Sequence, residues 1–365
     1  MAVIAVVGGP GAPGATSTAL ALLLAWPLRP GRRVLLVECD PDGGSVLAGA
    51  LEGRVEAVYG LRNLAVADRR GLLAQTLWEQ LIDLSPDGGG ERLLLPGLTD
   101  PAQAPGLAYT WEPLVETLQG LEPQGIDVIL DLGRSGAAGA GAVLARRADA
   151  VAVAVRTTLR GLSAARPRVA ALREDLETAG TGADALGLLL VAEGPYPAAE
   201  VSREFGVPVH GLLPYAPRTA RVLSDGGDTA DRRFVRSELM RTARTAADQL
   251  QVLIARRRQR LAPAPAPLPV PQPGLPQGAP APAPHPLAYP QHIAPPVAPQ
   301  QPAPAPFPGQ PQPGQPWPSQ PSQPGQAWPS QPSQPGPVPF GQPPFGRPAS
   351  GGAFPGGLGE VLRAR

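Results

Sequence analysis

Residues 2–25 read AVIAVVGGPGAPGATSTALALLLA: an apolar run, a loop of glycine and proline, and a second apolar run that opens at Thr16. The first run is typical of a buried β-strand, and the second is typical of a helix. Glycines in such a loop let the backbone approach an anion, and the N–H groups at the helix N-terminus complete an anion-binding nest. The segment therefore predicts either a phosphate-binding loop or a tight glycine-rich turn that binds nothing.

The spacing within this loop matches the phosphate-loop pattern G-x-x-x-x-G-K-[ST] at all but one position. Gly9 and Gly14 are the two glycines, and Thr16 stands where the hydroxyl binds Mg²⁺. Ala15 stands where the pattern has lysine, and the chain contains no lysine at all. Prolines at 10 and 13 each remove a backbone donor. The remaining donors of the loop and first helical turn are the N–H groups of Gly11, Ala12, Gly14, Ala15, Thr16 and Ser17.

Short apolar runs alternate with longer helical patterns over the first 260 residues. This alternation predicts an α/β fold with a doubly wound, mainly parallel sheet covered by helices on both faces. The expected strands are residues 2–7, 33–37, 92–95, 126–130, 150–155, 186–191 and 207–213. The expected helices are residues 16–26, 45–51, 71–84, 111–121, 141–147, 160–178, 197–205 and 231–260.

Proline divides the chain into two regions. Residues 1–260 hold 17 of the 51 prolines, and residues 261–365 hold the other 34. We therefore expect a folded domain over 1–260 and a disordered Pro/Gln/Gly-rich tail over 261–365. An 11-residue repeat begins at Trp317 and again at Trp328. Such a tail is either a solvated spacer or a ligand for protein partners with aromatic grooves.

Charge and composition exclude several classes of protein. Residues 1–260 carry 28 arginines against 29 acidic side chains, so no basic field supports contact with DNA or a membrane surface. A lone Cys39 excludes an internal disulfide framework, and a lone His210 in the folding region argues against zinc or histidine catalysis. No apolar run is long enough to cross a bilayer, and the first residues lack signal-peptide features. We expect a cytoplasmic protein.

Further segments follow the loop in an order that resembles the MinD/ParA-type deviant Walker P-loop ATPases, including the CpaE/TadZ-like members. The loop of that family reads K-G-G-x-G-K-[ST]-[ST], whereas residues 10–17 read PGAPGATS, so both lysines are missing. The matching segments are RRVLLVECDPDGG at 32–44, RLLLPGLTDP at 92–101, IDVILDLGR at 126–134, the strand and helix of 148–172, LGLLLVAEG at 186–194 and VPVHGLLPYAP at 207–217.

The resemblance implies a role for particular residues. Asp40 and Asp131 would be the catalytic carboxylates and would hold Mg²⁺ together with Thr16, although an Asp at a strand end also commonly caps a loop. Arg134 would meet a γ-phosphate or pair with Asp131, and Glu38 is expected to be structural. The nucleotide would lie against Gly9, Gly11, Gly14, Ala15, Thr16, Ser17, Arg134 and Pro214. The family's adenine-reading Asn is absent, since residues 191–193 read VAE.

Two functions follow from these residues. The first is a nucleotide-binding positioning or assembly factor, of the chromosome-partitioning or pilus/secretion type, that binds ATP or ADP with Mg²⁺. Its ATP hydrolysis would be weak or absent, because no loop cation stabilises the transition state. The alternative is a non-catalytic pseudo-ATPase scaffold that recruits protein partners through its tail. A homodimer is possible in either case. The missing charge would have to come from Arg29, Arg32, Arg33, Arg134, Arg156 or Arg160.

Overall fold

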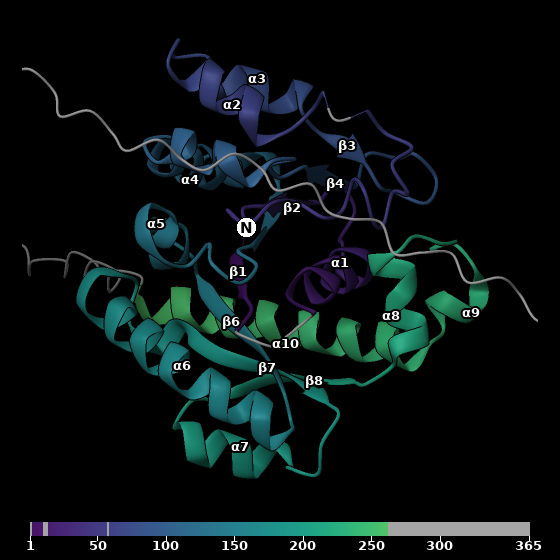
Figure 1. The fold of residues 1–365 in the computed structure, drawn as a ribbon, viewed down its shortest axis with the longest axis vertical. Coiled ribbons are helices and arrows are strands. Elements are labelled where there is room, and N and C mark those ends of the chain that lie inside the picture. The colour runs from purple at the N-terminus through teal and green to yellow at the C-terminus, as the bar shows by residue number, and fades with distance from the viewer. Residues whose placement is uncertain (1, 10–13, 57, 262–365) are drawn as a thin grey trace, which may run out of the picture. The chain divides into compact units, whose positions relative to one another are not determined.

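The computed structural model describes residues 2–9, 14–56 and 58–261, which form an eight-stranded sheet in the order β3-β4-β2-β5-β1-β6-β7-β8 (Figure 1). All neighbouring strands are parallel except β3 and β4, which are antiparallel. The expected doubly wound, mainly parallel sheet is confirmed. The strands are β1 Val3–Val7, β2 Arg33–Glu38, β3 Ile82–Asp83, β4 Arg92–Leu95, β5 Ile126–Asp131, β6 Ala150–Arg156, β7 Leu186–Ala192 and β8 Val209–Pro214.

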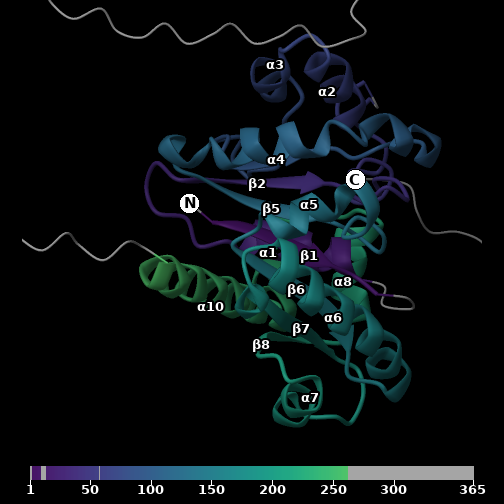
Figure 2. The ribbon, with the colours of Figure 1, turned by 90° about the vertical axis from the view of Figure 1, so that its left-hand side faces the viewer.

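Helices cover both faces of the sheet (Figure 2). One face packs against α1 Ala15–Ala25, α8 Pro217–Ser224, α9 Arg232–Val235 and α10 Glu238–Leu261. The other packs against α2 Leu61–Asp68, α3 Leu73–Glu79, α4 Trp111–Gln119, α5 Ala142–Arg146, α6 Leu159–Ala179 and α7 Ala198–Phe205. Short 3₁₀ turns lie at Pro101–Leu107, Glu122–Gln124, Gly139–Gly141 and Ala183–Ala185. None of the helices in these described residues is long and apolar enough to cross a membrane.

The central strand β1 shows why an uninterrupted apolar run forms a strand here. Every residue of β1 is buried, because Val3, Ala5 and Val7 enter one core cluster while Ile4 and Val6 enter the other. Alternate side chains of a strand point to opposite faces, so a strand covered on both faces is apolar throughout. Its position between β5 and β6 places the end of β1 in the middle of the sheet.

The segment after β2 does not form the expected helix over 45–51. It consists of successive turns over residues 46–53. Their backbone hydrogen bonds join residues three to six positions apart, instead of the regular i→i−4 pattern of an α-helix. Gly49 explains this, since a Cβ at this position would lie 2.1 Å from the Ser224 carbonyl oxygen. The glycine required by that contact also disfavours a helix.

Other boundaries differ more modestly from expectation. The expected helix over 71–84 ends at Glu79, and residues 82–83 instead pair with β4. The expected helix over 231–260 is split into α9 and α10. The helices α2 and α8 were not expected, although their sequences carry the signals. Apolar Leu61, Leu64 and Ala65 lie at helical spacing in α2, and Pro217 occupies the first position of α8.

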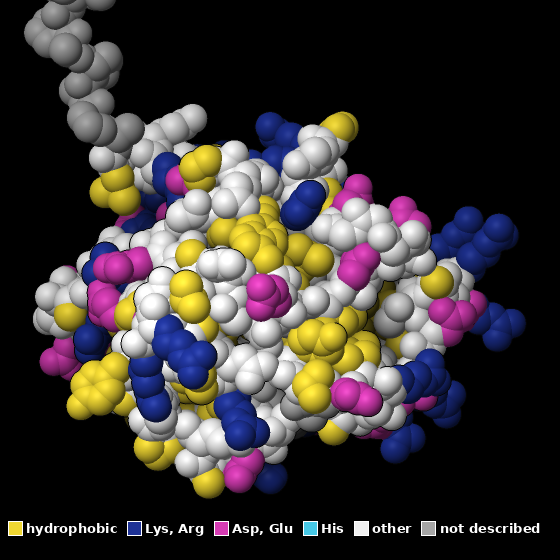
Figure 3. Space-filling model, turned by 90° about the horizontal axis from the view of Figure 1, so that it is seen from above, with side chains coloured by type: hydrophobic (Ala, Val, Ile, Leu, Met, Phe, Trp, Pro, Cys, Tyr) yellow, Lys and Arg dark blue, Asp and Glu magenta, His cyan; other side chains and the backbone are white. Residues whose placement is uncertain are grey.

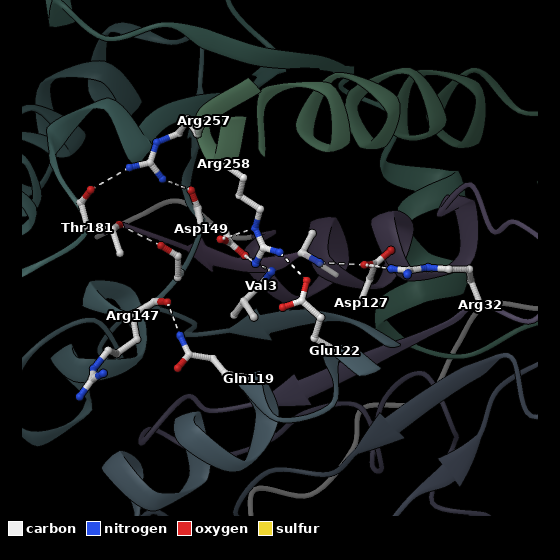
Figure 4. Close-up of polar contacts among 12 residues, drawn as sticks. Val3, Arg32, Gln119, Glu122, Asp127, Arg147, Asp149, Thr181, Arg257 and Arg258 are labelled. Atoms are coloured by element: carbon white, nitrogen blue, oxygen red, sulfur yellow. Dashed lines mark hydrogen bonds and ion pairs between the residues drawn. The ribbon is translucent and has the colours of Figure 1, made fainter. Parts of the chain in front are cut away.

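A buried carboxylate ties the first residues of the chain to the amino edge of the sheet (Figure 4). Asp127 Oδ1 accepts the Ala2 N–H at 2.8 Å and the Arg32 guanidinium at 2.7 Å, and Oδ2 accepts the Trp26 indole N–H at 2.9 Å. Arg32 is therefore held at the edge of the sheet opposite the β1 loop, so its guanidinium cannot supply positive charge to that loop.

A second group of contacts at the same edge fixes the end of α10 (Figure 4). Asp149 Oδ2 accepts the Val3 N–H at 2.8 Å, and both its oxygens accept the Arg258 guanidinium at 2.8 and 3.0 Å. Arg258 also binds Glu122 at 2.7 Å. At the basic end of α10, Arg258 is thus paired with acidic side chains of the same domain, which favours a structural role over contact with DNA or lipid.

The face that carries α2 and α3 is chemically mixed (Figure 3). Hydrophobic side chains gather near its centre, and arginines and acidic residues are interspersed around them. The exposed apolar side chains of the α2–α3 segment are Val58, Tyr59, Val66, Leu72 and Trp78. The described part of this face therefore shows no continuous basic field of the kind that nucleic acid requires.

We predict that Arg257→Ala lowers the free energy of unfolding by about 3 kcal/mol, because it removes a buried guanidinium together with its hydrogen bonds to three separate acceptors. The Arg257 side chain is 3% exposed, and it donates to the Asp149 and Thr181 carbonyls and to Asp184. Arg260→Ala is the matched control, since Arg260 pairs with the same Asp184 but is 64% exposed. This control should cost less than about 1 kcal/mol. Equal losses in urea unfolding of the two variants would contradict the prediction.

His210 gives the fold a dependence on pH. The ring is buried against Gly187, its Nε2 has no hydrogen-bond partner, and burial lowers the pKa of His210 to about 4. The unfolded chain, with a pKa of about 6.5, takes up the proton first, so stability should fall as the pH drops from about 6.5 to 4. In the His210→Leu variant, the loss of unfolding free energy between pH 6.5 and pH 4 should be about 3 kcal/mol smaller than in the unmodified protein. The check is unfolding free energy against pH, and parallel curves for the two proteins would refute it.

Candidate functional site

The residues expected to form a site follow strands that are neighbours in the sheet. Strands β2, β5, β1 and β6 are adjacent and parallel, so their carboxyl ends lie at one edge. The loop after β1, Asp40 after β2, and Asp131 at the end of β5 all lie there. Open α/β sheets bind ligands at this edge.

Asp131 and Thr16 come together as expected. Asp131 is buried, its carboxylate accepts the Gly133 N–H at 3.0 Å, and the Thr16 side chain lies near it. Burial raises the pKa of Asp131 to about 7; the negative charges of Glu38 and Asp40 add to this, while the Thr16 side chain and the Gly133 N–H oppose it. The first turn of α1 therefore lies beside the end of β5.

Asp40 lies between two loops and fixes their approach. Its Oδ1 accepts the Asp42 N–H at 3.0 Å, and its Oδ2 accepts the Arg134 N–H at 3.1 Å. Gly133 has a φ of +49°, and a Cβ there would lie 1.7 Å from Asp40 Oδ2. Glycine is thus required at 133 both by the backbone angle and by the carboxylate it faces.

Arg134 has a partner that the sequence did not suggest. Its guanidinium pairs with Asp42 at 3.3 Å, and the Ser135 hydroxyl donates to the same carboxylate oxygen at 2.8 Å. This pairing, rather than one with Asp131, is what the structure shows. The loops after β2 and β5 are thereby linked by a solvent-exposed ion pair as well as by Asp40.

Glu38 organises the loops rather than facing a ligand. Its buried carboxylate accepts the backbone N–H groups of Ser45 at 2.9 Å, Val46 at 3.1 Å and Gly97 at 3.1 Å. Burial raises the pKa of Glu38 although these hydrogen bonds oppose the shift. Such contacts fit the structural role expected for it. Within the described ranges, no group of three or more His, Cys, Asp or Glu side chains is arranged to hold a metal ion.

The β1 loop is described on both sides of a gap, and Gly11 lies outside the described residues. Gly14, at φ +121°, precedes α1. Gly8 donates its N–H to the Gly133 carbonyl at 2.7 Å, and a Cβ at Gly8 would lie 3.1 Å from that of Ala15. Ala15 is only 7% exposed. The position where phosphate loops carry lysine therefore packs inward, against the end of β1.

A pocket of about 260 Å³ extends from the start of α1 to the ends of β6, β7 and β8. It brings together Pro214, Gly14 and Ser17, three of the residues named from the sequence as candidate nucleotide contacts. Its lining is Gly14, Ser17, Thr18, Arg156, Val191, Leu213, Pro214, Tyr215, Ala216, Pro217, Ala220, Arg221, Ser224 and Leu239.

Among the arginines considered as a source of charge, Arg156 reaches this pocket. It pairs with Glu193 at 2.9 Å, and its guanidinium lies 5.5 Å from the centre of the Tyr215 ring. Sequence reasoning missed Tyr215 and the Glu193 pairing. A charged residue directly after the apolar runs of β6 and β7 was the available signal, but their proximity depends on the strand order.

Comparison with known proteins gives matches to solved structures. No family sequence model and no curated protein sequence matches the chain. A ParA family ATPase from Chlorobium tepidum is 17% identical, covers 68% of this chain and 97% of its own, and has a TM-score of 0.52. The septum site-determining protein MinD from Pyrococcus horikoshii, solved with Mg-ADP, is 17% identical, with coverages of 70% and 98% and a TM-score of 0.50.

A third solved structure, the MinC:MinD cell division complex of Aquifex aeolicus, matches at 16% identity, with coverages of 69% and 96% and a TM-score of 0.51. The three matches cover nearly the whole length of those chains, and about two thirds of this one. At such low identity they establish the architecture of the sheet and its helices. The chain has the fold of the MinD/ParA-type P-loop ATPase superfamily.

Proposed function

We propose that this protein is a nucleotide-binding positioning or assembly factor of the MinD/ParA type, acting in the cytoplasm, that binds ATP or ADP with Mg²⁺. The observation that carries the proposal is that the Thr16 side chain lies close enough to the Asp131 carboxylate to favour its ionised form. A hydroxyl at a helix N-terminus and a carboxylate at a strand end are brought to one point, beside a pocket that ends at Pro214. This is the arrangement that a magnesium-bound phosphate group requires.

The available groups fit such a cofactor. Thr16, Asp40 and Asp131 offer the oxygen ligands that Mg²⁺ prefers. The N–H groups of Gly14, Ala15, Thr16 and Ser17 would receive the phosphates at the start of α1. The pocket beyond them, lined by apolar and hydroxyl side chains and by Arg156 and Arg221, would hold the nucleoside. Magnesium would supply charge neutralisation at the phosphates.

Weak or absent hydrolysis follows from what the loop lacks. Phosphoryl transfer depends on cations that stabilise charge in the transition state. Ala15 provides none, and the Arg134 guanidinium is already paired with Asp42. We therefore infer that the protein acts by binding nucleotide rather than by hydrolysing it.

The inward packing of Ala15 also favours a second candidate, a pseudo-ATPase scaffold. In this case the domain would keep the fold without responding to nucleotide. Protein partners would be recruited through the tail of 261–365; its first residue, Leu261, ends α10, and residues 262–365 lie outside the described residues. Two copies of the chain would pair as a homodimer. The two candidates differ in whether any nucleotide binds.

We expect the full-length protein to bind nucleoside di- or triphosphates in a magnesium-dependent manner. Thr16→Ala should weaken that binding by about tenfold or more, because it removes a metal ligand. Thr178→Ala, which removes a hydroxyl bonded within α6, should leave it unchanged. Isothermal titration calorimetry with adenine and guanine nucleotides, with and without Mg²⁺, is the measurement. Failure of every nucleotide to bind at millimolar concentration would favour the scaffold.

Restoring the missing cation provides a test of the catalytic argument. Ala15→Lys should raise the rate of nucleotide hydrolysis by about tenfold or more, since an ammonium at this position meets the phosphates. Ala15→Met adds similar length without charge and serves as the matched control. The readout is phosphate release by the full chain in Mg²⁺. A Lys variant that is no faster than the Met variant would show that charge at position 15 is not what limits turnover.

A further inference from the structure

One arginine of the domain differs from the others in how its charge is accommodated. Among the residues that the structure describes, Arg168 is half-buried, and its guanidinium has no hydrogen bond or ion pair. Its nitrogen atoms are not enclosed by those residues, so a ligand can reach them. A cation withdrawn from water without a partner is unfavourable. Every other arginine that is buried or half-buried donates at least one hydrogen bond: Arg32, Arg92, Arg146, Arg156, Arg173, Arg257 and Arg258.

The position of Arg168 on α6 indicates which way its side chain faces. Asp175 lies two helical turns further along the same face of α6, and it pairs with Arg146 of α5 at 2.7 Å. Arg168 therefore lies on the side of α6 that faces α5 and the loop before it (Figure 2). Helical side chains lean toward the helix N-terminus, and α6 begins directly after β6. The guanidinium is thus directed toward the carboxyl edge of the sheet.

Charged groups of the candidate site act on Arg168. Burial lowers the pKa of Arg168, the negative charge of Asp40 raises it, and the positive charge of Arg134 lowers it again. Asp40 uses its two carboxylate oxygens on the backbone N–H groups of Asp42 and Arg134, and the Arg134 guanidinium pairs with Asp42. Arg168 is therefore the guanidinium of this group that has no carboxylate paired with it. An anion bound beside Asp40 would provide the missing partner.

The strand order gives the direction in which a bound nucleotide would lie. Pro214 ends β8 at one side of the 260 Å³ pocket, and the N–H groups at the start of α1 follow β1. Strands β5 and β2, which carry Asp131 and precede Asp40, lie on the side of β1 away from β8. A nucleotide with its base at Pro214 and its phosphates at α1 would therefore point its terminal phosphate toward Asp40 and Arg168.

We propose that Arg168 binds the terminal phosphate of a nucleoside triphosphate and thereby makes the protein prefer ATP to ADP. The proposal rests on the proposed nucleotide binding at this edge of the sheet. An arginine from α6 would take the place of the lysine that phosphate loops carry at the position of Ala15. It would favour binding of the triphosphate without completing the set of groups that phosphoryl transfer requires, which agrees with weak or absent hydrolysis.

The test is calorimetric titration of the full chain with ADP and with ATPγS, a slowly hydrolysed analogue of ATP, in the presence of Mg²⁺. We expect ATPγS to bind about tenfold or more tightly than ADP, the difference that one charge-assisted contact to a phosphate provides. Arg168→Gln should remove this preference and change the affinity for ADP by less than about twofold. Arg168→Lys keeps the charge and should retain most of the preference. Arg168→Met is a second neutral variant, which gives the answer if the Gln variant does not fold.

The stability of the nucleotide-free protein separates a ligand contact from a structural role. Because the Arg168 guanidinium is partly desolvated and unpaired, Arg168→Gln should leave the midpoint of urea unfolding unchanged or raise it. Arg173→Gln is the matched control on the same helix. Arg173 is also half-buried, but its guanidinium donates to the Phe205 and Gly206 carbonyls. This control should lower the midpoint and leave the ratio of ATPγS to ADP affinity unchanged.

The outcomes separate this inference from the proposed function. ADP binding as tightly as ATPγS, or a preference that survives both neutral variants, would overturn the role of Arg168 and leave nucleotide binding intact. Loss of the preference in Arg168→Lys or in Arg173→Gln would overturn it as well, since neither change removes the charge near Asp40. A lower urea midpoint for Arg168→Gln would show a structural arginine instead. Binding of neither nucleotide would overturn the proposed function itself, and this inference with it.

Discussion

The burial of β1 on both faces is the constraint on which the remaining structure depends. A strand with no polar side chain requires a helical layer on each side and a neighbour at each edge, which β5 and β6 provide. The chain can then leave β1 only at the carboxyl edge, and α1 must turn back across one face. Glycine loop, Thr16 and Asp131 meet because of this geometry, whether or not the loop retains a cation.

Much of this arrangement was predictable from the sequence. The seven main strands are mostly apolar runs, so their positions follow from local composition. Thr16 and Asp131 follow from their places near the ends of strands. The errors share a physical cause. Residues 46–53 are turns because Gly49 packs on Ser224, a contact between segments far apart in the chain. Likewise, Arg134 pairs with Asp42 only because two loops are brought together.

The loop after β1 has the spacing of a phosphate-binding loop, but it carries no cation of its own. Ala15 is buried in the core, and a guanidinium fixed by Glu193 and Tyr215 lies at the end of β6. No sequence pattern predicts the contacts of Arg156. Its partners, Glu193 and Tyr215, follow β7 and β8 and lie next to it only because of the strand order. The sequence can therefore predict the fold, while the side-chain contacts of the site depend on which strands are neighbours.

Gly133 has a mechanical consequence. Its Cα faces the Asp40 carboxylate, and its carbonyl accepts the Gly8 N–H, so it stands between the segment after β2 and the end of β1. With no side chain to absorb displacement, a shift of Asp40 is transmitted to the backbone of the β5 loop and from there to the start of the glycine loop. Three segments, around Gly8, Asp40 and Gly133, are therefore linked directly to one another. A methyl group at position 133 would push the Asp40 carboxylate and the β5 loop apart.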